Sequence, residues 1–527
     1  MKVLIPEKFA ADGTQVLEEA GVEVTYKPDC TPEELVQLIG EYDGLIVRSA
    51  TTVTREVIEA GENLKVIGRA GVGVDNIDST AATERGIVVC NAPTSNVVSA
   101  AEQTMALMLA VMRNTARADA SMKQGKWDRS KFTGHEMQGK TLAVFGLGHV
   151  GCLVIERAQA FGMKIIGYDP YCPPERAESM GVELLEDINE MCRRADVITV
   201  HLPKTKETTG MFGPEQYAIM KDGVVCINTA RGGIYDIEAM ADFIESGKIA
   251  GAGVDVWENE PVSDSPLHKF ENVVLTPHLG ASTKEAQTRA ATQIAEYVIA
   301  GMQGKTVPTV VNSARIPDEV MNQLSPYVPV CQKAGEILVQ LADSAISKLD
   351  VNVFGKIAAQ DPSILGTASV AGILSVGSEV TVNIINANYW AENRGIEVAT
   401  KTDPVSEDFA SYIELVAHAK NGDFQIAVTK TPAHDNPRII SIMNHDVDFV
   451  PGDYVAIMQY QDGPGRMGKI GTLLGNAGIS IDSMQIARDT EADAAVVCMN
   501  VDRIPNADLQ EKLTQSVDAL NAWFINL

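Results

Sequence analysis

The feature that most constrains the fold is a regular alternation of short apolar runs with polar stretches of helical pattern. In the first part of the chain, the runs rich in β-branched residues are 3–5, 22–26, 44–47, 64–67 and 87–90. Strands that alternate with helices in this way form a parallel sheet with helices on both faces. Residues 1–96 are therefore predicted to form one doubly wound α/β unit.

A second series of the same kind starts at residue 141, with apolar runs at 142–145, 164–168, 197–201, 224–228, 251–256 and 273–276. The capping-box pattern Ser282-Thr-Lys-Glu285 predicts that a helix follows, and an extended segment at 306–313 is expected to end the unit. The apolar stretch 97–124 is predicted to be one long helix, buried between domains or between subunits. Two doubly wound sheets in one chain predict a ligand cleft between them.

A glycine-rich turn stands at the start of the second series. Gly146-Leu-Gly148-His-Val-Gly151 has the GxGxxG spacing between a predicted strand and a predicted helix. Glycines there permit a tight turn and a close approach of the backbone to a pyrophosphate at the helix N-terminus. The motif is weak by itself, but Asp169 ends the next predicted strand, where a carboxylate binds ribose hydroxyls and repels a 2′-phosphate. Together they predict NAD, and not NADP, as the cofactor.

Three charged residues follow later strands of the same predicted sheet: Arg231, Glu260 and His278. An arginine can bind a carboxylate through two parallel hydrogen bonds. A histidine can exchange a hydroxyl proton near neutral pH, and a neighbouring carboxylate can hold its ring. Each residue alone has a plainer explanation, such as an exposed histidine or a Glu-Pro turn. Their shared position at strand ends beside a dinucleotide site predicts a catalytic centre.

The composition limits the possible partners and location. The formal charge is −27, from 43 Lys and Arg against 70 Asp and Glu. A field of that sign opposes polyanions, so neither nucleic acid nor an anionic membrane is an expected partner. The eight cysteines contain no CxxC, as is typical of a reducing compartment, and no metal site is predicted. With no signal peptide and no apolar run of about 18 residues, a cytoplasmic location is expected.

The order of the motifs GLGHVG, Asp169, NTARGG, DVWENEP and PHLGAST resembles that of the D-isomer-specific 2-hydroxyacid dehydrogenases, over residues 1–313. The resemblance implies that Arg231, Glu260 and His278 are catalytic and that a hydride passes from the substrate to NAD. The cofactor-binding positions expected from the motif and the resemblance are Gly146, Gly148, His149, Val150, Gly151, Asp169, Pro203, Thr229, Ala230, Asp255, His278, Gly280 and Ala281.

Segments 45–51, 69–76 and 92–96 resemble the branch of this family that oxidises 3-phosphoglycerate to 3-phosphohydroxypyruvate, the first committed step of serine biosynthesis. A phosphoester in an acidic protein needs cations, and Arg48 is the best candidate. Without the resemblance, an exposed arginine at a strand end is an equally good reading of Arg48. Arg129 or Lys131 is expected to reach in, from the same subunit or from a partner subunit. The expected substrate-binding positions are Arg48, Ser49, Val72, Gly73, Asn96, Lys131 and Arg231.

The last two regions carry weaker signals. Residues 314–450, with strands predicted at 380–385 and 423–431, resemble the intervening domain of the long-form enzymes. Residues 451–527 resemble the ACT domain, a small ligand-sensing module. The turn at 462–468 opens a predicted helix whose N–H groups could receive a carboxylate. Asp462 and Asn476 are expected to complete an L-serine site between subunits, although a simple tight connection would also explain this turn.

The sequence thus predicts an α/β chain of four parts. These are a flavodoxin-like substrate-binding domain (1–96 and 284–313), a Rossmann-type NAD-binding domain (97–283), an α+β intervening domain (314–450) and a ferredoxin-like ACT domain (451–527). A homo-oligomer, either a dimer or a tetramer, is expected. Two alternatives stay open. One is a dehydrogenase for another D-2-hydroxy acid, such as glycerate, lactate or 2-hydroxyglutarate, and the other is a regulatory protein that senses NAD.

Overall fold

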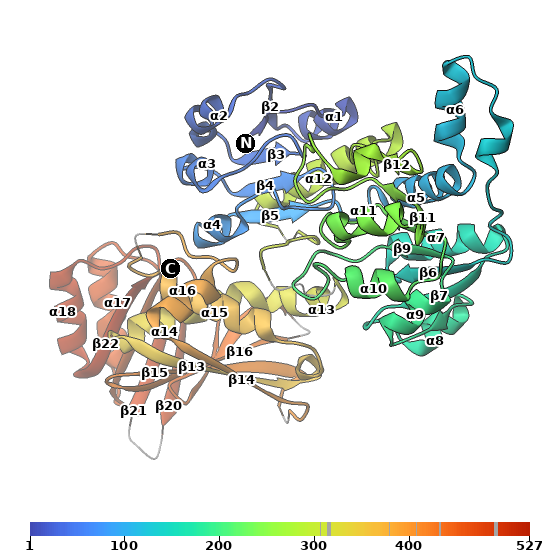
Figure 1. Cartoon of the computed structure of the whole chain (residues 1–527). Helices are drawn as coiled ribbons and strands as arrows, with labels where there is room; N and C mark the ends of the chain where they lie inside the picture. The colour runs from blue at the N-terminus through green and yellow to red at the C-terminus, as the bar shows by residue number, and fades with distance from the viewer. Residues whose placement is uncertain (306, 314–317, 379, 407, 432–433, 490–493) are drawn as a thin grey trace.

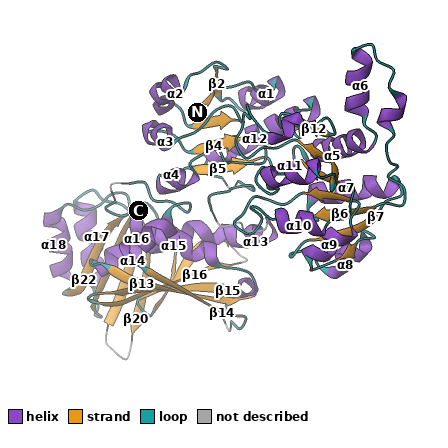
Figure 2. Cartoon of the chain, viewed as in Figure 1, coloured by secondary structure: helices purple, strands orange, loops and turns teal. Residues whose placement is uncertain are grey.

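The computed structural model describes residues 1–527 apart from 306, 314–317, 379, 407, 432–433 and 490–493. The described strands form four sheets, which follow one another along the chain (Figures 1 and 2). Two are wholly parallel and lie in the N-terminal part, and the other two are largely or wholly antiparallel. This arrangement confirms the predicted fold class, whereas the exact domain boundaries stay predictions.

The first sheet has the flavodoxin-like strand order β2-β1-β3-β4-β5. Helices α1 (Ala11–Glu19) and α12 (Lys284–Met302) pack on one face, so the chain returns to this sheet after the second one is complete. The opposite face is covered by α2 (Pro32–Leu38), α3 (Arg55–Ala60) and α4 (Ser79–Glu84). The strands are β1 (Lys2–Ile5), β2 (Glu23–Tyr26), β3 (Gly44–Val47), β4 (Val66–Arg69) and β5 (Val88–Asn91).

The second sheet is parallel, with the order β12-β11-β10-β9-β6-β7-β8. Its strands are β6 (Thr141–Phe145), β7 (Lys164–Tyr168), β8 (Glu183–Leu184), β9 (Val197–Val200), β10 (Val224–Asn228), β11 (Ile249–Val254) and β12 (Val273–Leu275). The connecting helices are α7 (His149–Ala160), α8 (Pro174–Ser179), α9 (Ile188–Arg194), α10 (Pro214–Ile219) and α11 (Ile237–Glu245). The strand order reverses between β6 and β9, which is where sheets of this type bind dinucleotides.

The long helix predicted over 97–124 is broken in two. Helix α5 (Val97–Met112) is largely buried, whereas α6 (Thr115–Lys123) has no buried residue and projects from the body of the molecule in Figure 1. Asn114 between them has φ +51°, a left-handed conformation that asparagine tolerates better than most residues. The prediction of one continuous buried helix is therefore wrong beyond residue 112.

Two further expectations for the first unit need correction. Helix α12 is capped by Thr283, whose hydroxyl accepts the N–H of Ala286 at 3.1 Å, so the start is one residue later than the predicted cap at Ser282. The predicted extended segment is only partly extended: within 307–313, Val310 forms a bridge to Cys90 of β5, and most of the other residues lie in turns or bends. Thr306, the first residue of the predicted segment, lies outside the described residues.

The third sheet has the order β14-β13-β15-β16-β17-β18. Its strands are β13 (Ile346–Gly355), β14 (Glu397–Asp403), β15 (Ser411–Ala419), β16 (Gly422–Thr431), β17 (His434–Ile442) and β18 (His445–Phe449). Its helices are α13 (Asp318–Leu324), α14 (Val328–Ala342), α15 (Ser363–Ser375) and α16 (Ala387–Arg394). The strand predicted at 423–431 is confirmed by β16. The one at 380–385 is wrong, because the Asn386 side chain binds the backbone of Thr381 and Asn383 and holds a turn.

The fourth sheet is antiparallel, with the order β20-β21-β19-β22. Its elements follow as β19 (Tyr454–Gln461), α17 (Arg466–Asn476), β20 (Ile481–Asp489), β21 (Ala494–Val501), α18 (Ala507–Ser516) and β22 (Ala519–Asn526). This is the βαββαβ order of a ferredoxin-like fold. One face packs on α17 and α18, and the other face shares a continuous apolar core with α14. The third and fourth sheets are hereafter the C-terminal part (318–527).

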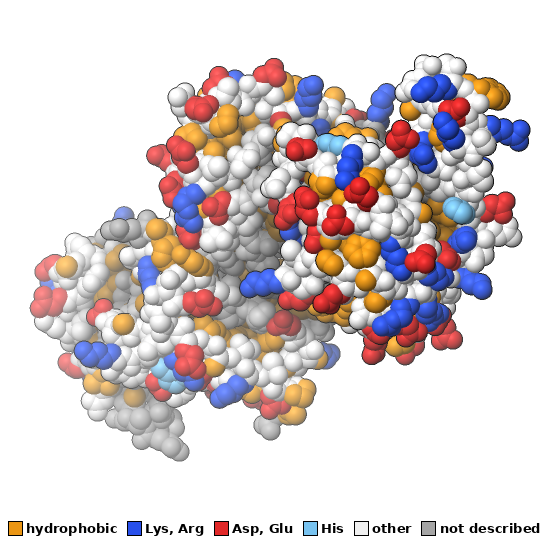
Figure 3. Space-filling model, in the orientation of Figure 1, with side chains coloured by type: hydrophobic (Ala, Val, Ile, Leu, Met, Phe, Trp, Pro, Cys, Tyr) orange, Lys and Arg blue, Asp and Glu red, His pale blue; other side chains and the backbone are white. Residues whose placement is uncertain are grey.

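Short 3₁₀ turns complete the described structure: η1 (Ile39–Glu41), η2 (Arg129–Phe132), η3 (Pro266–Lys269), η4 (Ser325–Tyr327) and η5 (Lys356–Ala359). Within the described ranges, none of the helices is long and apolar enough to cross a membrane. Acidic and basic side chains lie next to one another over much of the face in Figure 3. Among the ion pairs of the described residues, Arg194 binds both Glu183 and Glu190.

Candidate active site

The predicted cofactor loop follows β6 and enters α7. Gly146 has φ +98°, and a Cβ there would lie 2.7 Å from the His201 carbonyl oxygen. At Gly151 a Cβ would overlap the Gly146 carbonyl oxygen, whereas Gly148 faces open space. The first and last glycines therefore allow the close turn, and the middle one leaves the backbone free for a ligand. His149 and Val150 are the first residues of α7. His149 is exposed, and Val150 packs against the apolar core between α7 and the second sheet.

Asp169 directly follows β7 and is tied to this loop. One carboxylate oxygen accepts the N–H of Leu147 and the other accepts the N–H of Tyr171, both at 2.9 Å. The carboxylate is therefore fixed beside the glycine turn, at the end of the neighbouring strand. This is the position that a ribose-binding carboxylate needs. The glycine loop and Asp169 together fit a dinucleotide.

The other predicted cofactor positions line the carboxyl edge of the same sheet. Thr229 and Ala230 follow β10, and the Thr229 hydroxyl lies 2.7 Å from that of Thr104 on α5. Pro203 lies exposed after β9, and its carbonyl oxygen accepts the Thr208 hydroxyl. Gly280 and Ala281 lie between β12 and α12, with Gly280 buried. These residues come from strands that are neighbours in the sheet.

Asp255 is fully buried, and both of its carboxylate oxygens are engaged. Oδ1 accepts the Thr276 hydroxyl at 2.5 Å and the Leu279 N–H at 2.7 Å, and Oδ2 accepts the Gly280 N–H at 2.8 Å. The Asp255 carbonyl oxygen also accepts the N–H of His278 at 2.8 Å. Asp255, predicted as a cofactor contact, thus braces the loop that carries His278.

His278 and Glu260 form the expected pair. The Nδ1 atom of His278 lies 2.7 Å from Oε2 of Glu260, and Oε1 of Glu260 accepts the N–H of Trp257 at 3.0 Å. A proton on Nδ1 satisfies this contact, so Nε2 is left for a substrate. His278 has φ +55°, a strained conformation for a residue with a side chain, and its loop is held there by Asp255. The pair is preorganised for proton transfer.

Arg231 is brought to this pair and to the first sheet by close backbone packing. Gly232 lies so near the backbone of Trp257 that a Cβ would overlap it, which joins the Arg231 loop to the Glu260 loop. On its other side, Arg231 lies over Gly73, where a Cβ would be 2.9 Å from Nη2. The Arg231 Nε atom is 3.9 Å from the exposed carboxylate of Asp75. Arg231 therefore stands between the two parallel sheets.

An arginine that the sequence reasoning did not select completes the cationic site. Arg69 ends β4, and burial lowers its pKa to about 10, with the nearby charges of Arg231 and Arg48 acting in the same direction. Its Nε atom is buried without a hydrogen-bond partner among the described residues. Three arginines, Arg48, Arg69 and Arg231, thus gather in a site that favours an anion. The signal that could have identified Arg69 is its position at a strand end, which it shares with Arg48.

The remaining predicted substrate positions lie in several different segments of the structure. Ser49 is exposed next to Arg48, and Val72 and Gly73 lie in the loop after β4. The carbonyl oxygen of Val72 accepts the Asn91 side chain at 2.6 Å. Asn96 immediately precedes α5, in the connection from the first sheet to the second. Lys131 lies on η2, in the projecting segment after α6, where it binds Asp128 at 3.2 Å.

The predicted effector residues are not neighbours within one chain. Asp462 lies before α17 and pairs with Arg488, whose Nε is 3.2 Å from its carboxylate. Asn476 is the exposed last residue of α17. The helix has 11 residues, which corresponds to about 15 Å. The two residues of one subunit therefore flank opposite ends of this helix.

A large cavity lined by described residues, about 1530 Å³, is elsewhere. It lies between the first sheet and the C-terminal part, bordered by Arg55, Arg85 and Trp390 among others. None of Arg231, Glu260 and His278 lines it.

Comparisons with known proteins agree with this architecture. Residues 105–280 match the family described as D-isomer specific 2-hydroxyacid dehydrogenase, NAD binding domain, which confirms NAD as the predicted cofactor. Residues 323–443 match the D-3-phosphoglycerate dehydrogenase intervening domain, and residues 454–518 match the ACT domain.

Some similar proteins match the whole chain, and some solved structures match 59% of it. The D-3-phosphoglycerate dehydrogenase of Methanocaldococcus jannaschii is 42% identical over 527 residues, all of both chains, and that of Mycobacterium leprae is 41% identical over all of this chain and 99% of the relative. Among solved structures, the TT0316 protein of Thermus thermophilus is 33% identical, with a TM-score of 0.55 over 59% of this chain and 100% of its own. D-lactate dehydrogenase of Escherichia coli is 28% identical, with a TM-score of 0.54 and the same coverage. The chain belongs to the D-3-phosphoglycerate dehydrogenase family of D-isomer specific 2-hydroxyacid dehydrogenases.

Proposed function

We propose that this protein oxidises 3-phospho-D-glycerate at C2 to 3-phosphohydroxypyruvate with NAD, as the first step of L-serine biosynthesis. The observation that carries the proposal is the combination of the His278–Glu260 pair with three gathered arginines, Arg48, Arg69 and Arg231. A substrate with a carboxylate at one end and a phosphate at the other would neutralise these arginines. The names of the full-length relatives support the same substrate.

Arg231 would bind the C1 carboxylate and polarise the C2 oxygen, while Arg48 and Arg69 face the phosphate. The Nε2 atom of His278 takes the C2 hydroxyl proton, and Glu260 stabilises the imidazolium that results. NAD, when bound, supplies the hydride acceptor. In the reverse direction the protonated His278 returns the proton, so the same residues would serve reduction of a 2-oxo acid.

The residues that would hold NAD are those of the glycine loop and the adjacent strand ends. The N-terminus of α7, with the exposed backbone of Gly148, would receive the pyrophosphate. Asp169 would bind the ribose hydroxyls and repel a 2′-phosphate. The predicted positions Thr229, Ala230 and Gly280 would border the nicotinamide.

The test is a spectrophotometric assay with NAD and 3-phosphoglycerate in the presence of a trap for the product. Turnover of 3-phosphoglycerate well above that of D-glycerate is expected. Arg48→Ala should raise KM for 3-phosphoglycerate more than for an unphosphorylated 2-hydroxy acid. Equal turnover of both substrates by the wild type would favour another D-2-hydroxy acid. No turnover with any 2-hydroxy acid would favour an NAD-sensing protein.

Oligomerisation and effector binding form the second part of the proposal. The projecting segment around α6 would contact a second copy and carry Lys131 towards its active site. L-serine would bind between ACT domains, with Asp462 from one subunit and Asn476 from the other, because within one chain they flank opposite ends of α17, a helix about 15 Å long. Light scattering would give the subunit number, and calorimetry with L-serine on the wild type and Asn476→Ala would test the site. The expected location is the cytoplasm.

A further inference from the structure

A buried carboxylate holds the backbone of the loop that carries Arg48 and Ser49. Glu7 lies two residues after β1 and is 7% exposed. Its Oε1 atom accepts the N–H of Arg48 at 2.7 Å and that of Thr51 at 3.1 Å, and its Oε2 atom accepts the N–H of Ala50 at 3.1 Å. Three N–H groups of one short loop therefore point at a single side chain.

The carbonyl groups of the same loop are held by a second side chain. The Nδ2 atom of Asn76 donates to the carbonyl oxygens of Arg48 at 2.8 Å and Thr51 at 2.6 Å. The guanidinium of Arg48 is itself oriented by a bond from Nη1 to the Lys8 carbonyl oxygen at 3.1 Å. These bonds fix the backbone of the loop and the side chain of Arg48. The bonding partners lie close together because β1, β3 and β4 are adjacent in the sheet.

By its charge alone, Glu7 opposes the proposed function. A carboxylate near Arg48 and Arg69 lowers the positive potential that would attract a phosphate. By charge alone, removal of this carboxylate should therefore strengthen binding of an anionic substrate. If Glu7 serves to position the loop, removal should weaken binding instead. The two roles predict changes of opposite sign, so one measurement separates them.

We infer that Glu7, with Asn76, is a positioning residue that sets Arg48 and Ser49 for the phosphate end of the substrate. The inference deepens the proposed function and rests on it. A glutamine at position 7 has one acceptor oxygen in place of two and puts an amide group opposite an N–H donor. At least one of the three backbone bonds is lost, and the loop shifts. A misplacement of about 1 Å can cost as much as 10²-fold in an oriented site.

The experiment compares Glu7→Gln with Asp75→Asn. Asp75 is a matched control, because it also puts a carboxylate near Arg231 and Arg69 but is 89% exposed. Glu7→Gln should raise KM for 3-phosphoglycerate by about 10-fold or more, with kcat within about threefold and the Kd of NADH unchanged. KM for an unphosphorylated 2-oxo acid should rise far less. Asp75→Asn should leave KM unchanged or lower it.

A KM for 3-phosphoglycerate in Glu7→Gln at or below the wild-type value would overturn the inference. So would an equal rise of KM for phosphorylated and unphosphorylated substrates. If Glu7→Gln does not fold, Glu7→Asp keeps the charge and withdraws the carboxylate by one methylene, and a wild-type KM there would also overturn it.

The wild type tests the proposed function separately. If it does not turn over 3-phosphoglycerate, that function fails, and the inference is then judged by calorimetry with inorganic phosphate. Weaker phosphate binding by Glu7→Gln than by the wild type would support the positioning role, and equal or tighter binding would refute it.

Discussion

The substitution Asp255→Asn tests whether the loop under His278 is preorganised. Asparagine keeps the size of the side chain but has one acceptor oxygen where aspartate has two. In its best orientation it retains the Thr276 hydroxyl and the Leu279 N–H, and it turns its amide group towards the Gly280 N–H. One charge-assisted bond is lost, a buried donor is left unpaired, and the two remaining bonds become neutral. The expected loss of stability is about 2–4 kcal/mol.

The effect on catalysis follows from the backbone of His278. Its φ of +55° is held by the Asp255 brace, so a weakened brace lets the loop relax and moves the imidazole away from Glu260. Turnover should fall by about 10- to 10²-fold. The assays are initial rates at saturating substrate and thermal unfolding. Thr276→Val, which removes one bond to Oδ1 and the bond that the Thr276 hydroxyl accepts from Gln103 but leaves the charge of Asp255, should have a smaller effect. An Asp255→Asn enzyme with turnover within about twofold of the wild type would refute the reasoning.

Three further predictions test the acid–base residue, the cofactor choice and a histidine of the third sheet. His278→Ala should lower turnover by about 10²- to 10⁴-fold with little change in NADH binding, and unchanged rates would contradict its role. Asp169→Ala should raise the ratio of NADP to NAD turnover, because the carboxylate that repels a 2′-phosphate is removed; an unaltered ratio would assign that selectivity elsewhere. Hydrogen bonds to Asp350 and Asp423 raise the pKa of His418, so its protonated form stabilises the fold. That contribution is present below the unfolded pKa and is lost as pH rises through the higher folded pKa. The stability difference between the wild type and His418→Gln should therefore shrink above about pH 6.5, by no more than about 1 kcal/mol, and a difference independent of pH would exclude this pairing.

Local signals predicted the parallel sheets and the cofactor loop well. The GxGxxG turn is a local property, because Gly146 and Gly151 are required by backbone contacts within a few residues and to the adjacent strand. The strand ends that carry Arg231 and His278 follow from the same alternation of strands and helices. Local signals alone therefore predicted that these residues of the second sheet lie at one edge, which is where the structure places them.

Other features depend on contacts that a single sequence does not reveal. Arg69 is part of the cationic site because it lies near Arg231, which is far away in the chain. Glu7 acts on a loop that follows it by 41 to 44 residues. Residues 380–385 have the composition of a strand, but the side chain of Asn386 forms bonds that hold them in a turn. The break at Asn114, whose side chain donates to the Thr133 carbonyl oxygen at 3.2 Å, interrupts a stretch that is otherwise strongly helical. In each case a tertiary or side-chain contact outweighs the local pattern.

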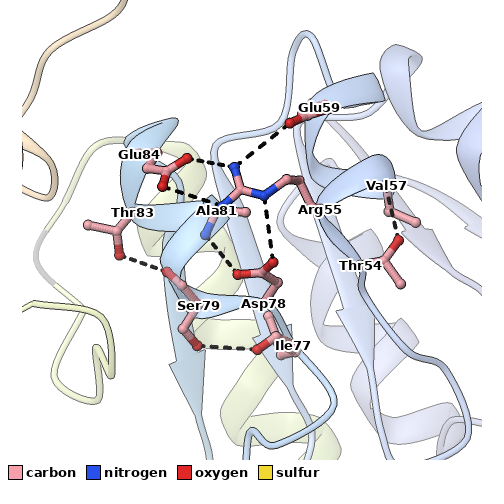
Figure 4. Close-up of polar contacts among 10 residues, drawn as sticks. All are labelled: Thr54, Arg55, Val57, Glu59, Ile77, Asp78, Ser79, Ala81, Thr83 and Glu84. Carbon is pink, nitrogen blue, oxygen red and sulfur yellow. Dashed lines mark hydrogen bonds and ion pairs between the residues drawn. The ribbon is translucent and has the colours of Figure 1, made fainter.

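Helix α4 is held at both ends by charged contacts. The two terminal nitrogens of Arg55 on α3 reach the Glu84 carboxylate at 2.6 and 3.4 Å, and its Nε lies 4.0 Å from Asp78, which caps the start of α4 (Figure 4). Glu59 adds a further contact to Arg55 at 3.8 Å. These contacts fix α4 against α3, so the helix cannot shift without its neighbour.

The C-terminal part is tied to the end of this same helix. Asn386 and Trp390 both donate to the Glu84 carbonyl oxygen at 3.3 Å, and Asn383 donates to the Gly86 carbonyl oxygen at 2.8 Å. The third and fourth sheets share one apolar core, so these bonds link both of them to the end of α4. The loop with Gly73, which lies against Arg231, leads directly into α4. Any rotation of the C-terminal part that keeps these bonds must therefore move α4 and the substrate loop together.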